Sequence, residues 1–241
     1  MTVTKIFFFV ALGMVLFHTN SNAVAQQAVA GQYKILFDGT SLDAWRGYAD
    51  ETVGKGWKIV DGALLFDGSG GGDLVTKEEF GDFELSFDWR VPAGSNSGVM
   101  YRVGLGDEAP YLTGPEYQIL DDGGHADGKN PLTSAASLYG LYVPENKCLN
   151  PLCCWNSAKI VAQGNRIEHW LNGTKVLEAE IGSDTWIERI QNSKFKKWTK
   201  FATLPSGRIC LQDHGNETWY RHITIQVFDA PPPVQGAIQS P

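Results

Sequence analysis

The sequence of 241 residues lacks several features that would indicate particular classes of protein. Its 20 Lys and Arg residues are outnumbered by 27 Asp and Glu residues, and the formal net charge is −7 without a basic cluster of the kind that binds phosphates. This balance argues against nucleic acid and anionic membranes as partners. There is no CxxC pair with a nearby histidine pair, which argues against a structural zinc site. The sequence also shows no internal repeat.

Long hydrophobic runs are equally scarce. The clearest one, residues 6–17, is too short to span a bilayer. Lys5 precedes it, and Ala23-Val24-Ala25 follows after a polar stretch, a pattern typical of a secretory signal. We therefore predict a signal peptide at residues 1–25, a periplasmic or secreted location, and no membrane insertion after cleavage. A short membrane anchor is the alternative interpretation.

Cysteine is also sparse, with four residues in the whole chain. Export would permit disulfides. Cys148 and Cys153 enclose only the residues LNPL, so this pair is the easiest to close. We predict a disulfide between them.

Short strand-like segments separated by Gly, Asp and Asn make up most of the remaining sequence. In DFELSFDWRV, from Asp82 to Val91, apolar and polar residues alternate as in a strand with one buried face. Asp61-Gly62 and Asn172-Gly173 are hairpin signals between such segments. This rhythm predicts an all-β sandwich of two antiparallel sheets in a single domain, residues 26–229. Residues 184–198 interrupt it and predict a short helical excursion, and the Pro-rich residues 230–241 predict a loose tail.

Polar side chains stand at strand positions or next to strands in four stretches: NSGVMYRV, EYQILDDGGH, LYGLYV with the following Trp-Asn, and LQDHGNETWYRHI. Alternation places Glu116 and Gln118 on one face of a strand that runs into a loop with Asp121 and His125. Each residue alone is equally explained as a turn former or a solvent-exposed side chain. The candidates from all four stretches are Arg102, Glu116, Gln118, Asp121, His125, Tyr139, Trp155, Gln212, His214 and Arg221.

Taken together, the motifs resemble a known family. FDGTSLDAW, NSGVMYR, GPEYQILDD, LYGLYVP, WNSAKI, HWLNGTKVLE, SKFKKW and LQDHG with WYRHI occur in this order from Tyr33 to Phe228. The chain is similar to the 3-keto-disaccharide hydrolase domain family. The resemblance implies a concanavalin A-like, laminin-G-like jelly-roll sandwich and action on glycosides already oxidised at sugar carbon 3.

The implied chemistry needs one general base and donors for a developing oxyanion. A ketone at C3 acidifies the C2 proton, so a base can remove it and expel the substituent at C1, after which water adds back. Glu116 or His125 is the expected catalytic base. The expected substrate-binding residues are Arg102, Gln118, Asp121, Tyr139, Trp155, Gln212, His214 and Arg221. Of these, Arg102, Gln212, His214 and Arg221 are expected to converge on the cavity that Glu116 and Gln118 face, with Tyr139 and Trp155 nearby.

Three further expectations concern ligands and alternatives. We expect an oligosaccharide or glycoside as substrate and no cofactor, although Glu116, Asp121 or His125 could hold a divalent metal through hard ligand atoms. A conventional glycosidase of the same fold would instead need two carboxyl groups flanking one bond. A carbohydrate-binding module without a catalytic base is the alternative from a different class.

Overall fold

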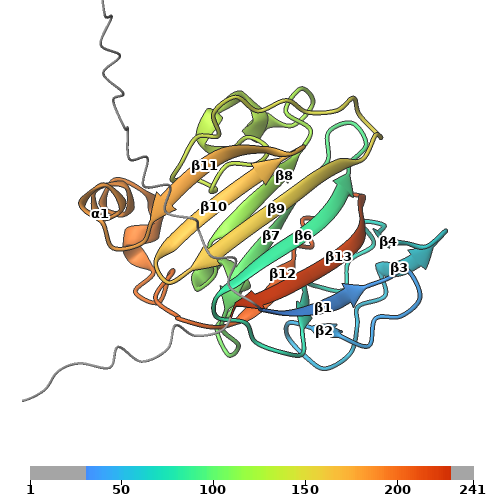
Figure 1. The fold of residues 1–241 in the computed structure, drawn as a ribbon. Helices are drawn as coiled ribbons and strands as arrows, with labels where there is room; N and C mark the ends of the chain where they lie inside the picture. The colour runs from blue at the N-terminus through green and yellow to red at the C-terminus, as the bar shows by residue number, and fades with distance from the viewer. Residues whose placement is uncertain (1–30, 229–241) are drawn as a thin grey trace, which may run out of the picture.

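Two antiparallel sheets form the protein, as the sequence predicts (Figure 1). The computed structural model describes residues 31–228, so the predicted signal peptide and the Pro-rich tail lie outside the described residues. The larger sheet has eight strands, in the order β11-β10-β9-β6-β13-β4-β3 with β1 paired to β13. Their bounds are β1 Gly31–Phe37, β3 Trp57–Val60, β4 Ala63–Phe66, β6 Phe83–Arg90, β9 Asn156–Gln163, β10 Arg166–Leu171, β11 Thr174–Glu180 and β13 Thr218–Phe228.

The smaller sheet has five strands in the order β2-β5-β12-β7-β8. These are β2 Trp45–Gly47, β5 Leu74–Thr76, β7 Asn96–Val103, β8 Glu116–Leu120 and β12 Arg208–Leu211. The helical elements are η1 Pro110–Leu112, η2 Ala126–Lys129, η3 Pro131–Thr133, α1 Asp184–Gln191 and η4 Lys194–Lys197. The predicted helical excursion is therefore confirmed as α1 and η4, and α1 lies at one side of the sandwich beside β11 (Figure 1).

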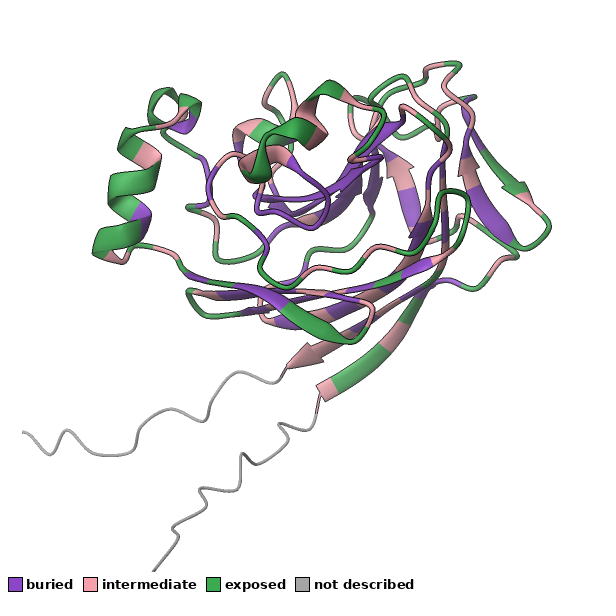
Figure 2. Ribbon diagram, turned by 90° about the horizontal axis from the view of Figure 1, so that it is seen from above, coloured by how far each residue is buried: buried purple, intermediate pink, exposed green. Residues whose placement is uncertain are grey.

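Strand alternation explains the core between the sheets. On β6, Phe83, Leu85, Phe87 and Trp89 are buried, and the residues between them are partly exposed. Buried residues lie along the strands, whereas α1 is mostly exposed (Figure 2). The two predicted hairpins are also confirmed, because Asp61-Gly62 and Asn172-Gly173 each have positive φ at both positions and join paired strands.

The five-stranded sheet is buried on both faces, and this positions the site. All five residues of β8 are buried, and Tyr117, Ile119 and Leu120 belong to the hydrophobic core whereas Glu116 and Gln118 do not. Glu116 and Gln118 project from the opposite face, where helical segments and loops cover them. The segment before Tyr139 runs along the free edge of β8, with Tyr139 N donating to Glu116 O over 3.0 Å.

Candidate functional site

A cavity lies on the face of the five-stranded sheet that is turned away from the core. Its volume is about 480 Å³, including the open mouth. The lining residues come from strands β7 and β8, from helical segments and from loops: Asn96, Tyr111, Glu116, Gln118, Asp127, Tyr139, Lys194, Gln212 and His214. The structure therefore brings together five of the residues predicted from the sequence, namely Glu116, Gln118, Tyr139, Gln212 and His214.

Glu116 reaches the cavity because its diagonal neighbour on β7, Gly98, has no side chain. Strand β7 pairs with β8, and Gly98 lies opposite Gln118 in that pairing. A Cβ atom at position 98 would lie 2.2 Å from Glu116 Oε1, so only glycine leaves space for the carboxyl group. The glycine of the NSGVMYR motif thus has a direct role in shaping the site.

The Glu116 carboxyl group is unusual in its electrostatics. The residue is only 8% exposed. Burial raises the pKa of Glu116 to about 8, with Asp73 and Asp127 raising it further and Lys194 opposing the shift. A carboxyl group that titrates near neutral pH inside a polar cavity is typical of a general acid or base.

Lys194 supplies the positive charge of the cavity. It begins η4, whose N-cap Ser193 accepts a hydrogen bond from Phe195 N over 3.2 Å. The Lys194 ammonium lies 4.4 Å from the centre of the Tyr139 ring. Burial lowers the pKa of Lys194, and Glu116 counteracts that shift. Lys194 lies in the motif SKFKKW, but the sequence analysis did not assign it to the site. Asn96, Tyr111 and Asp127 were not predicted either.

Amide side chains line the floor beside Glu116. Gln118 Nε2 donates to Asn96 Oδ1 over 3.3 Å, and Asn96 Nδ2 lies 3.4 Å from His214 Nε2. Gln118 Oε1 and Gln212 Oε1 are buried and have no hydrogen-bond partner within residues 31–228. Buried amide oxygens without a partner are costly. Both residues line the cavity, so their amide groups are candidates for contact with a bound ligand.

His125 lies at the rim rather than among the lining residues. Its ring centre is 5.9 Å from that of His214 in an edge-to-face arrangement. His125 Nδ1 accepts a hydrogen bond from Asp127 N over 3.2 Å and so caps η2. This bond engages Nδ1 with the backbone, and the His125 ring does not line the cavity. This geometry favours Glu116 over His125 as the base.

Asp121 serves the loop instead of the cavity. Its carboxylate accepts hydrogen bonds from Gly94 N over 2.8 Å and from Gly123 N over 3.0 Å. These backbone bonds, with that of Gly124, hold the pKa of Asp121 below its ordinary value. The expectation that Asp121 lines the cavity is wrong because its oxygens are used to hold a turn.

The expectation that Arg102 points into the cavity is also wrong. Arg102 has φ +51°, and the pairing of β7 with β12 shifts register at this point. This β-bulge turns the side chain toward the end of the other sheet. There Arg102 donates to Gly81 O and Gly164 O and forms a 3.1 Å ion pair with Asp82.

Trp155 and Arg221 lie outside the cavity as well. The Arg221 guanidinium stacks 4.3 Å from the Trp155 ring centre and forms a 2.9 Å ion pair with Asp88. Asp88 is on the outward-facing side of β6 in the eight-stranded sheet. The predicted convergence fails here because strands β6, β9 and β13 belong to the other sheet, and alternation alone does not reveal sheet membership.

The cysteine loop differs from the expectation. Cys148, Cys153 and Cys154 are exposed and unbonded, so the predicted Cys148–Cys153 disulfide is wrong. Hydrogen bonds hold the loop instead: Asn172 Nδ2 donates to Cys148 O over 2.9 Å, and Cys153 N donates to Val91 O over 3.2 Å.

Between Gly31 and Phe228, no three His, Cys, Asp or Glu side chains gather closely enough to hold a metal ion. Over the same residues, no helix has the length and apolar character that crossing a membrane requires.

The matching family and three proteins that this chain resembles are all described as acting on sugars. Residues 32–226 match the family described as the 3-keto-alpha-glucoside-1,2-lyase-like domain. A protein of Bacteroides thetaiotaomicron named 3-keto-disaccharide hydrolase is 36% identical, with 83% of this chain and 80% of that protein covered. A crystal structure from Parabacteroides distasonis, described as a candidate glycosyl hydrolase, is 33% identical with a TM-score of 0.77 over 83% of this chain and 94% of that one. A second structure of this kind from the same organism is 28% identical, with a TM-score of 0.65 over 82% and 100% of the two chains.

Proposed function

Because the chain belongs to the family of 3-keto-alpha-glucoside-1,2-lyase-like domains, we propose that it cleaves 3-keto-glycosides by elimination followed by hydration. The relatives identify it as a carbohydrate-active enzyme of the glycosidic hydrolase type. The observation that carries the finer proposal is the pairing of a buried carboxyl group, Glu116, with a cation, Lys194, in one cavity lined by amides.

The proposed reaction begins with proton transfer from C2 of the sugar to Glu116. The electron pair of the C2–H bond forms an enolate with the C3 carbonyl. When the enolate collapses, the C3 ketone re-forms, a C1–C2 double bond appears, and the aglycone leaves with the electron pair of the C1–O bond and takes up a proton. Water then adds across the double bond, with hydroxyl to C1 and a proton to C2, so the net result is hydrolysis.

Glu116 suits the first step because its raised pKa makes it a stronger base than an ordinary carboxylate. A base with a pKa near that of the working pH combines a sufficient ionised fraction with a useful driving force for proton transfer. The ionised fraction grows as the pH rises through about 8. We therefore expect kcat/KM to increase with pH over this range.

Lys194 and the amide groups suit the second requirement, which is to stabilise the enolate. A charged donor fixed in a partly buried site stabilises a developing oxyanion more than water does. We assign this role to Lys194, in place of the arginines that the sequence suggested. Gln118 and Gln212 are assigned to substrate hydroxyl groups, because their carbonyl oxygens lack partners.

Conventional glycoside hydrolysis is a second candidate, because Asp127 lines the same cavity as Glu116. Such a mechanism uses a protonated carboxylic acid and an ionised carboxylate on opposite sides of one bond. It would act on an unoxidised glycoside. A carbohydrate-binding module would bind either compound and cleave neither.

The proposal is tested by incubating the purified protein with a 3-keto-disaccharide and with its unoxidised parent, each with and without a chelator. We expect release of the 3-keto sugar from the first compound alone, with no effect of the chelator if the enzyme works without a metal. Cleavage of the parent at a comparable rate would replace the proposal with the conventional mechanism.

We also propose that the protein acts outside the cytoplasm after removal of residues 1–25. The support is the basic, apolar and small-residue pattern that ends at Ala25. Mass spectrometry of protein from its native host should find a mature chain that begins at Gln26, and recovery of chains that retain Met1 would contradict this.

A further inference from the structure

Tyr111 presents an exposed aromatic ring at the cavity. It is 44% exposed and is also one of the lining residues. It belongs to the short helix η1, which is fixed by hydrogen bonds from Gly114 N to Pro110 O over 2.9 Å and from Thr113 Oγ1 to the same oxygen over 3.2 Å. The ring is therefore held at the cavity by a well-anchored turn, at a position where burial does not account for an aromatic residue.

Trp198 lies next to Tyr111 and is supported from behind. The two ring centres are 5.3 Å apart, with 39° between the ring planes. Trp198 packs edge-to-face on Phe195 at 5.2 Å and lies 6.3 Å from Phe201. We refer to Tyr111 and Trp198 together as the aromatic shelf. Tyr111 is the member of the shelf that lines the cavity, and Trp198 packs against the core and supports it. Because the Tyr111 ring is pre-positioned, a ligand that stacks on it meets little cost of ordering.

Lys194 connects the aromatic shelf with the inner part of the cavity. Its ammonium is 5.5 Å from the Trp198 ring centre and 4.4 Å from that of Tyr139. Tyr139 is next to Glu116, to whose carbonyl its backbone N–H donates. The cavity therefore has a buried end, formed by Glu116, and an exposed aromatic end.

We propose that the aromatic shelf is the subsite that binds the leaving sugar ring of a 3-keto-disaccharide. This rests on the proposed function, which places the reacting sugar at Glu116. With C2 at the buried carboxyl group, the leaving group on C1 extends toward the mouth. A sugar ring offers an apolar C–H face to an aromatic ring, and stacking of this kind adds to the burial of apolar area.

The test compares two substrates that differ only in the aglycone, a 3-keto-disaccharide and methyl 3-keto-glucoside. The methyl group is too small to reach the shelf. Tyr111→Ala is expected to lower kcat/KM for the disaccharide by roughly 10-fold, and for the methyl glycoside by less than about 2-fold. Tyr111→Phe keeps the ring and should retain the wild-type values for both. Tyr33→Ala is the matched control, because Tyr33 is 63% exposed on β1 of the other sheet and should change neither value.

The possible outcomes separate the two proposals. An equal loss on both substrates, or no loss on either, would overturn the shelf assignment while leaving the proposed function intact. A wild-type protein that cleaves neither compound would overturn the proposed function and the shelf assignment with it. Trp198→Leu provides a second variant with the same expected preference, and equal melting temperatures of wild type and Tyr111→Ala establish that the effect is local.

Discussion

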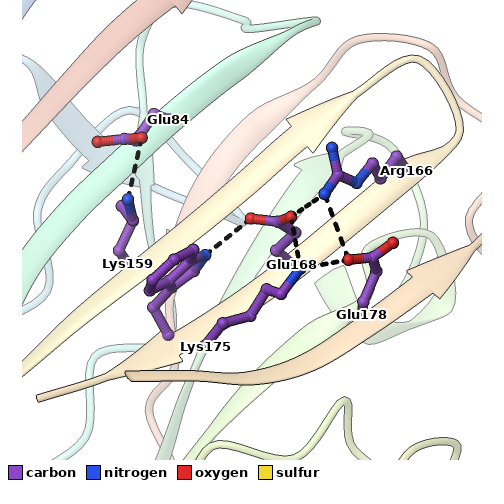
Figure 3. Close-up of polar contacts among 7 residues, drawn as sticks. Glu84, Lys159, Arg166, Glu168, Lys175 and Glu178 are labelled. Carbon is purple, nitrogen blue, oxygen red and sulfur yellow. Dashed lines mark hydrogen bonds and ion pairs between the residues drawn. The ribbon is translucent and has the colours of Figure 1, made fainter. Parts of the chain in front are cut away.

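The outer faces of the two sheets carry polar residues in different ways. On the eight-stranded sheet, charged groups are paired with opposite charges across β6, β9, β10 and β11 (Figure 3). Glu168 accepts from Lys175 over 3.2 Å and from the Trp170 indole over 2.8 Å, and it also pairs with Arg166. On the five-stranded sheet, Glu116 is buried with a strongly raised pKa, and two amide oxygens have no partner.

This difference separates a solvated surface from a site. Glu168 is as buried as Glu116, but Arg166, Lys175 and the Trp170 indole satisfy its carboxylate. Buried polar groups without partners cost stability, and a protein retains them where they serve a ligand or a reaction. The raised pKa of Glu116 within a cavity therefore favours the five-stranded face as the candidate site.

Loss of Glu116 should have the largest effect. Glu116→Gln preserves the shape of the side chain but removes the base, so kcat on a 3-keto-glycoside should fall roughly 100- to 10,000-fold. Steady-state kinetics with purified variants measures this. Near wild-type turnover in Glu116→Gln would remove Glu116 from the mechanism.

Replacement of Lys194 should have the next largest effect. Lys194→Met keeps the length of the side chain and removes the charge, so kcat should fall by roughly 100-fold. Because Lys194 opposes the rise in the pKa of Glu116, the pH at which activity rises should also move upward. Lys159→Met is the matched control, since Lys159 stacks on Trp170 on the other sheet. A pH profile that is unchanged in Lys194→Met would contradict the coupling.

The buried carboxyl group also predicts a dependence of stability on pH. The pKa of Glu116 is about 8 in the folded protein and near 4.5 when exposed. Between these values the folded state holds a proton that the unfolded state releases, so this group's contribution to stability falls as the pH rises from about 4.5 to about 8. The variant Glu116→Gln has no carboxyl group at this position, so its stability does not fall through this effect as the pH rises. Thermal melting from pH 5 to pH 9 should show the variant gaining stability relative to wild type, and a constant difference would refute the raised pKa.

The smallest effect is expected on the eight-stranded face. Glu178 is about half exposed and pairs with Arg166 over 3.2 Å. Glu178→Gln should change the free energy of unfolding by less than about 1 kcal/mol and leave kcat unaltered. Chemical denaturation and kinetics on the same preparation measure both quantities. A large loss of activity here would break the distinction between the two faces.

The sequence predicts the fold well because the alternation of apolar and polar residues in a strand, and the Gly, Asn and Asp residues of a turn, determine structure through neighbouring residues. It also predicts which face of β8 carries Glu116 and Gln118, since alternation holds throughout that strand. Arg102 is mispredicted because a bulge with positive φ interrupts the alternation of β7, and nothing in NSGVMYRV indicates it.

Other parts of the site depend on contacts between distant segments. Lys194 belongs to η4, which reaches the cavity through tertiary packing, and Tyr111 belongs to a short helix between two strands. Trp155 and Arg221 are mispredicted because strand pairing, and hence membership of a sheet, follows from long-range register. The base candidate was thus accessible from the sequence, whereas its cationic partner required the structure.

The central claim is that cleavage begins with removal of the proton from C2, and reaction in deuterium oxide tests it most directly. Elimination followed by hydration places a solvent deuteron on C2, so the 3-keto sugar released at early times should carry deuterium there, as read by mass spectrometry and NMR. Product and substrate incubated with Glu116→Gln provide the control for spontaneous exchange. Release of a product that retains hydrogen at C2, above that control, would contradict the account and show direct displacement at C1.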